Sequence, residues 1–353
     1  MDYTTLGGTG TSVSEIGLGC NTLGLDSSER WDWTVGEAKS KEIVDRAVEL
    51  GINFFDTANS YSWGDSERVL GDALGEYDRD EQVVATKVYN DASDDPHPNS
   101  SGLSRKTVEQ ELSNSLDRLG MDHVDLYQIH RWDYDTPIEV TVRALADAVR
   151  RGDVTYVGAS SMWAYQFADA LHTSREPGLE PFATMQNHYN LVYREEEREM
   201  LPFCLENDVG VIPWAPLAGG FLARPHEQIH ATTRGETSSS LRRRPYRENG
   251  GVEINERVAE LADDGLELVE ALGVEDDFEV AGVREKAVDG RVELPETDAG
   301  AVGVGVVGDA VEVAVGVLEY RVAVVLGDRV GVHEELRDAG RGVADRDARR
   351  DVA

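Results

Sequence analysis

Four polar residues in the first half of the chain have the types needed for acid–base chemistry: Asp56, Tyr61, Lys87 and His130. A tyrosine phenol has an ordinary pKa of about 10, which is too high for free proton exchange at neutral pH. A nearby ammonium group stabilises the phenolate and lowers that pKa. Lys87 can supply this charge, Asp56 can hold the lysine by an ion pair, and His130 can hydrogen-bond a substrate carbonyl oxygen. These residues therefore predict a proton donor, Tyr61, with its supporting groups.

Alternating apolar and amphipathic segments in the first 220 residues must position these side chains. Apolar runs predict strands at 16–20, 53–58, 82–88, 124–130, 154–160, 183–189 and 209–215. Helical periodicity lies between them, near 40–50, 65–75, 104–119, 137–151, 163–172 and 195–207. Ser104 stands where a helix N-cap is expected. Continuous apolar strands that alternate with helices indicate a parallel sheet covered on both faces.

Polar residues also stand at the carboxyl ends of these strands: Asp56, Lys87, His130, Ser160, Gln186 and Trp214. In a barrel of parallel strands these ends meet at one mouth, where barrel enzymes carry out their chemistry. In an open sheet they could not all reach one site. The sequence therefore predicts the α/β class and a (β/α)8 TIM barrel, of which seven βα units are recognisable.

The chain is strongly acidic, with 68 acidic and 34 basic residues and a net charge of −34. Such a surface repels nucleic acid and anionic membranes, so we expect neither as a partner. Residues 1–264 carry −23 of the charge, so it is not confined to a tail. Because the Debye length falls to roughly 3 Å in 1 M salt, molar salt screens the self-repulsion. The composition therefore predicts a halophilic protein with an acidic surface.

The chain has two cysteines, Cys20 and Cys204, without the spacing of a disulfide framework or a zinc site. No metal site is therefore predicted. The N-terminus has no basic segment followed by an apolar one, and no apolar run reaches about 18 residues. We therefore expect a soluble, cytoplasmic protein. The sequence leaves its oligomeric state open.

Several sequence runs, taken together and in order, resemble the aldo-keto reductases. They are FFDTANSYSWGDSERVLGDAL at 54–74, VVATKV at 83–88, LYQIH at 126–130, VGASS at 157–161, QNHYN at 186–190 and PWAPLAGGFL at 213–222. The catalytic tetrad of that family falls on Asp56, Tyr61, Lys87 and His130. The resemblance covers residues 3–264.

This resemblance implies reduction of an aldehyde or ketone to an alcohol, or the reverse, with NADPH as the cofactor and NADH as the alternative. A small carbonyl or alcohol compound would be the substrate, and Tyr61 would donate the proton. Ser160, Ser161 and Gln186 would bind the nicotinamide carboxamide, and Trp214 would stack on its ring. The turn that would approach the pyrophosphate contains Ala215, Pro216, Leu217, Gly219 and Gly220. The chain has Ser161 where many members have Asn, and Trp214 where Tyr is commoner.

Two other functions remain open for the same residues. Lys87 on a barrel strand could be the nucleophile of a Schiff-base aldolase. The barrel could also be a non-catalytic, nucleotide-binding regulatory subunit.

The family pattern ends at residue 264, where the resemblance implies an eighth strand, a phosphate-binding turn and two final helices. Residues 265–353 consist instead mainly of Val, Gly, Ala, Asp and Glu, which account for 67 of 89 positions. The codons of all five begin with G. Leu, Pro, His and Arg, most of whose codons begin with C, bring the total to 85.

A GC-rich genome concentrates G and C at third codon positions, and a shift of frame moves this bias to the first position. Residues 1–264 are therefore interpreted as the reductase-like barrel and residues 265–353 as a frame-shifted translation. The alternative is a genuine Val/Gly-rich extension.

Overall fold

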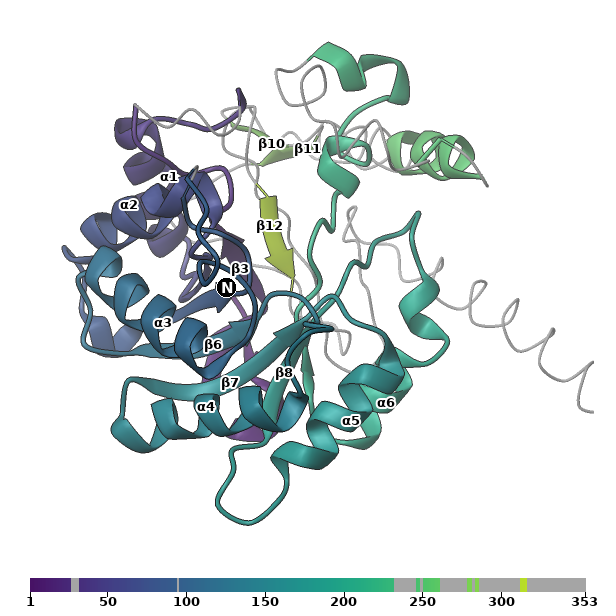
Figure 1. Cartoon of the computed structure of the whole chain (residues 1–353). Coiled ribbons are helices and arrows are strands. Elements are labelled where there is room, and N and C mark those ends of the chain that lie inside the picture. The colour runs from purple at the N-terminus through teal and green to yellow at the C-terminus, as the bar shows by residue number, and fades with distance from the viewer. Residues whose placement is uncertain are drawn as a thin grey trace, which may run out of the picture.

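A curved parallel sheet forms the centre of the molecule (Figure 1). The computed structural model describes residues 1–26, 32–93, 95–231, 246–247 and 250–260, with three short strands nearer the C-terminus. The seven parallel strands are β3 (Ile16–Gly19), β4 (Phe54–Asp56), β5 (Val83–Val88), β6 (Val124–Ile129), β7 (Val154–Ser160), β8 (Phe182–Gln186) and β9 (Gly210–Val211). Each pairs in parallel with the next. The prediction of seven βα units in a (β/α)8 arrangement is confirmed.

Helices cover the outer face of this sheet (Figure 1). They are α1 (Glu37–Glu49), α2 (Asp65–Leu74), α3 (Arg105–Leu119), α4 (Ile138–Arg151), α5 (Ala164–Ser174) and α6 (Met200–Glu206). Their apolar faces pack with outward-facing strand residues such as Val84 and Tyr127 in one core. Ser104 caps α3, as predicted, because its hydroxyl accepts the backbone N–H of Thr107. Among the residues that the structure describes, no helix has the length and apolarity to cross a bilayer.

The inner face of the sheet changes from apolar to polar along the strands. A hairpin of β1 (Tyr3–Thr5) and β2 (Ser12–Ser14) lies at the amino ends. A small inner core is formed by side chains from this hairpin, from β4, β5 and β6, and from the residue after β9: Leu6, Val13, Phe54, Val83, Ala85, Leu126 and Ile212. Because alternate strand residues share a face, Lys87 follows Ala85 and Asp56 follows Phe54 on the inside. The polar groups therefore collect at the carboxyl ends.

The strands beyond residue 260 do not continue the parallel pattern. β10 (Phe278–Val280) and β11 (Val283–Glu285) form an antiparallel pair. β12 (Glu312–Val315) pairs antiparallel with β3, whereas the strand that completes a (β/α)8 barrel runs parallel to its neighbours. In the described part of the chain β9 pairs with β8 alone. The predicted boundary at 264 and most of 265–353 lie outside the described residues.

Candidate active site

Lys87 joins the groups at the carboxyl ends of β4 and β5. Its Nζ lies 2.5 Å from Asp56 Oδ2 and 3.1 Å from Tyr61 Oη. It also donates a hydrogen bond of 2.8 Å to the Thr57 carbonyl oxygen. The same ammonium group lies 4.7 Å from the centroid of the Tyr61 ring. The structure thus brings together three of the four residues in which the sequence predicted acid–base chemistry.

The Lys87 side chain is completely buried. Burial alone lowers the pKa of Lys87, but the negative charges of Asp56 and of an ionised Tyr61, with their hydrogen bonds, outweigh burial and raise it above its ordinary value. The side chain is therefore an ammonium ion at neutral pH. A cation held at this distance stabilises negative charge on the Tyr61 oxygen.

His130, the fourth predicted residue, directly follows β6 and stands edge-on to Tyr61. The two ring centroids are 5.7 Å apart and the interplanar angle is 80°. Asn90 Nδ2 lies 3.3 Å from His130 Nδ1. An amide N–H that donates to Nδ1 places the hydrogen of the neutral imidazole on Nε2. Asn90 was not predicted, because it lies in a loop without periodicity.

The residues predicted for the nicotinamide carboxamide lie at the ends of β7 and β8. Ser160 Oγ is 3.1 Å from Ser161 Oγ, and the Trp214 indole N–H donates to Ser161 Oγ at 3.0 Å. The Ser161 backbone N–H donates to the Gln186 carbonyl oxygen. The Gln186 side chain donates in turn to Asp56 Oδ1 at 3.1 Å. The predicted cofactor residues and the acid–base group therefore form one hydrogen-bonded network.

The turn at 215–220 has an unusual backbone. Four of its residues have left-handed φ angles: Ala215 (54°), Ala218 (53°), Gly219 (67°) and Gly220 (99°). Pro216 and Leu217 are half-buried, and the Leu217 carbonyl accepts the Gly220 N–H. The two alanines are strained in this conformation, and such strain gathers at functional sites. The backbone, more than the side chains, gives this turn its shape.

His188 was not predicted, although it orients Trp214. Its imidazole stacks on the indole of Trp214, with centroids 4.4 Å apart, and on the ring of Tyr193, with centroids 4.2 Å apart. His188 Nε2 lies 2.8 Å from Tyr246 Oη. The sequence signal was the run QNHYN, but a stack of side chains from two different loops is visible only in three dimensions.

Two buried amides were also missed. Gln128 Nε2 donates to Asp56 Oδ1 at 2.8 Å, and Asn187 Oδ1 accepts the Ser161 N–H at 2.9 Å. Gln128 lies two residues before His130, so strand alternation places it on the same inner face. That spacing could have identified it.

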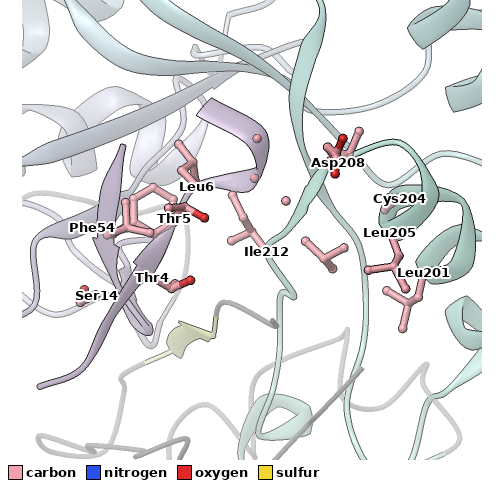
Figure 2. Close-up of a pocket in the computed structure, with 16 residues that line it drawn as sticks. Thr4, Thr5, Leu6, Ser14, Phe54, Leu201, Cys204, Leu205, Asp208 and Ile212 are labelled. Atoms are coloured by element: carbon pink, nitrogen blue, oxygen red, sulfur yellow. The ribbon is translucent and has the colours of Figure 1, made fainter. Parts of the chain in front are cut away.

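A cavity of about 220 Å³ lies between the β1–β2 hairpin and α6 (Figure 2). Its walls come from the β1–β2 hairpin, the start of β4, α6 and β9, including Leu6, Phe54, Leu201, Leu205 and Ile212. It contains none of the predicted site residues and is not the candidate active site. In the described ranges no cluster of His, Cys, Asp and Glu could hold a metal ion.

Comparison with known proteins identifies the family of this chain. The model of the Aldo/keto reductase family matches residues 15–275. An aldo-keto reductase of Metarhizium robertsii is 42% identical over 286 residues, which are 74% of this chain and 76% of that protein. The versiconal hemiacetal acetate reductase of Aspergillus parasiticus is 39% identical, over 74% of this chain and 81% of the relative. A putative aryl-alcohol dehydrogenase of Schizosaccharomyces pombe is 39% identical, over 74% of this chain and 80% of the relative. The chain belongs to the aldo/keto reductase family of NAD(P)H-dependent oxidoreductases.

Proposed function

We propose that this chain reduces an aldehyde or ketone to the alcohol with NADPH, and that Tyr61 supplies the proton. The observation that carries the proposal is the buried group in which Lys87 Nζ lies 2.5 Å from Asp56 and 3.1 Å from Tyr61 Oη. The names of the relatives, reductases and an alcohol dehydrogenase, support carbonyl and alcohol chemistry.

The residues at the ends of β7 and β8 fit a nicotinamide. A carboxamide has N–H groups that donate and a carbonyl oxygen that accepts hydrogen bonds. The hydroxyls of Ser160 and Ser161 and the side-chain amide of Gln186 can pair with the donors and with the acceptor. Trp214 provides a flat ring that His188 and Ser161 hold in place. The bound nicotinamide would supply the hydride that the carbonyl carbon receives.

The protein supplies the proton. Tyr61 Oη donates it to the carbonyl oxygen, so that one hydride and one proton together convert the carbonyl to the alcohol. Lys87 stabilises the tyrosinate that is left, and water then protonates it again. His130, with its hydrogen on Nε2, orients the carbonyl oxygen as a hydrogen-bond donor.

Steady-state NADPH oxidation with a panel of aldehydes and ketones tests this function. We expect oxidation that requires the carbonyl compound, and parallel assays with NADH give the cofactor preference. NADPH binding by fluorescence titration, without turnover on any panel member, would instead support the non-catalytic regulatory barrel.

Borohydride trapping distinguishes the reductase from a Schiff-base aldolase. A Schiff base requires a neutral amine, whereas the raised pKa of Lys87 keeps it protonated. We therefore expect no mass increase on the Lys87 peptide after borohydride treatment with carbonyl substrate. An adduct that depends on substrate and disappears in Lys87→Met would establish the aldolase.

We propose that the acidic surface is an adaptation to a cytosol with molar salt. The supporting observation is the net charge of −23 on residues 1–264, whose self-repulsion salt screens. The thermal unfolding midpoint is expected to rise by several degrees between about 0.1 M and about 3 M KCl. NaCl at the same ionic strength is expected to act alike, because screening does not depend on the cation. Equal midpoints at both KCl concentrations would contradict the adaptation.

We also propose that residues 1–264 are the catalytic barrel and that residues 265–353 are translated in a shifted frame. The G- and C-first codon bias supports this proposal. Its structural support is that β12 runs antiparallel to β3 and so cannot take the place of a parallel eighth strand. An apolar cavity lined by Leu201, Leu205 and Ile212 adjoins β9, the last parallel strand that the structure describes.

A further inference from the structure

The Asp56 carboxylate has two oxygens with separate roles. Oδ2 accepts the Lys87 ammonium at 2.5 Å. Oδ1 accepts two amide N–H groups, from Gln128 at 2.8 Å and from Gln186 at 3.1 Å. The amide nitrogen of Gln186 also lies 3.3 Å from Gln128 Oε1. Gln128 therefore contacts both the carboxylate that holds Lys87 and the amide at the cofactor end.

The inside of the sheet is shaped around Gln128, which is completely buried. Its strand neighbours in register are Lys87 on β5 and Gly158 on β7. A Cβ on Gly158 would lie 3.0 Å from Gln128 Cγ and 2.4 Å from Thr184 Oγ1. Glycine at 158 thus leaves the room that the glutamine side chain occupies.

We propose that Gln128 is a positioning residue for the reductase reaction. Its amide fixes the rotation of the Asp56 carboxylate, and through it the direction of the Lys87 ammonium towards Tyr61. Its carbonyl oxygen also orients the Gln186 amide at the cofactor end. This role rests on the proposed function, because it acts through Tyr61 as proton donor.

Gln128→Met tests the role with a side chain of similar size that has neither donor nor acceptor. We expect kcat to fall roughly 10- to 100-fold, because small misplacements of catalytic groups have effects of this size. The Kd for NADPH is expected to stay within about twofold, because Ser160, Ser161 and Trp214 do not contact Gln128 and Gln186 keeps its hydrogen bond to Asp56 Oδ1. Thermal unfolding of the variant verifies that it is folded.

Thr184→Val is the matched control. Thr184 lies on β8, in register with Gly158 of β7 inside the same sheet, and its buried hydroxyl has no hydrogen-bond partner among the described residues. Valine has nearly the same shape, so kcat is expected to stay at the wild-type value. A Gln128→Met effect that Thr184→Val reproduces would reflect general packing and overturn the positioning role.

The pH dependence of kcat in Gln128→Glu supplies a second measurement, which a change in packing alone would not affect. The titratable or charged groups that face this position are Asp56 from β4, Lys87 from β5, Tyr61 beyond the lysine and His130, which follows β6. β7 and β8 present Gly158 and Gln186, which do not titrate. A protonated carboxyl donates to Asp56 Oδ1 as the amide did, whereas an ionised one repels Asp56. The ratio of variant to wild-type kcat is therefore expected to be highest at low pH and to fall as pH rises.

These measurements separate the role of Gln128 from the function itself. They are made on the full chain, with NADPH and the best carbonyl substrate of the panel. A wild type that binds NADPH but turns over no carbonyl compound refutes the proposed function and this role with it. An active wild type with unchanged kcat in Gln128→Met, or a pH-independent ratio for Gln128→Glu, overturns the role of Gln128 alone.

Discussion

Replacement of Tyr61 by phenylalanine is expected to lower kcat for carbonyl reduction by roughly 10²- to 10⁴-fold, the usual contribution of a positioned general acid. The variant keeps the aromatic ring beside His130 and removes only the oxygen that lies 3.1 Å from Lys87. NADPH binding is expected to be unchanged, because the residues proposed for the nicotinamide lie on β7, β8 and the turn after β9. Stopped-flow NADPH oxidation and fluorescence titration measure the two quantities separately.

Tyr127→Phe is the control for this substitution. Tyr127 lies on β6 and its hydroxyl donates to the Val108 carbonyl oxygen within the outer core, away from the site. Loss of that hydroxyl is expected to lower stability slightly, by about 1 kcal/mol, and to leave kcat at the wild-type value. Retained turnover in Tyr61→Phe would remove Tyr61 as the proton donor.

Restoration of the reading frame after codon 264 is expected to raise both the affinity for NADPH and the thermal stability of the protein. One of the other two frames should encode a short apolar strand that ends in glycine, then a turn rich in Ser, Thr and Arg, then two amphipathic helices. The restored protein is expected to bind NADPH roughly 10- to 100-fold more tightly, because charge-assisted hydrogen bonds to phosphate are among the strongest in proteins. It should also unfold at a higher temperature, since a parallel eighth strand would pair with β3 and β9.

A chain cut after residue 264 is the matched control for the restored frame. If residues 265–353 contribute nothing to the barrel, the shortened chain should bind NADPH as the full chain does. The nucleotide sequence itself gives the sharpest test. Two alternative frames without such a strand and turn would mean that the Val/Gly-rich segment is genuine.

The strands and helices up to residue 211 were predictable because each carries a strong local signal. Parallel strands buried on both faces have continuous apolar runs. The start of α3 was predictable because the hydroxyl of Ser104 can cap a helix. The β1–β2 hairpin was not predicted, because its three-residue strands, Tyr-Thr-Thr and Ser-Val-Ser, contain no apolar run. The helix expected at 195–207 is instead the short turn Glu195–Glu197 and α6. Pro202 explains this, since proline lacks an N–H and is tolerated only in the first turn of a helix.

The candidate site was predictable where chemistry appears at a strand end. Asp56, Lys87 and His130 stand where β4, β5 and β6 end, and the fold brings them together. Gln128 was missed because a glutamine inside an apolar strand appears, in the sequence alone, to be an exception to the pattern. Only the structure shows that it donates to the second oxygen of Asp56. The contacts of His188 likewise depend on two different loops that no local pattern connects.

Transfer of deuterium from NADPH labelled at nicotinamide C4 tests the central claim most directly. The label must be placed on each face of C4 in turn, and the product alcohol analysed by mass spectrometry. A hydride-transferring carbonyl reductase is expected to deliver one deuterium to the carbinol carbon from one face only. An alcohol product without deuterium from either face, or no alcohol with any carbonyl compound, would contradict the assignment of this chain as a carbonyl reductase.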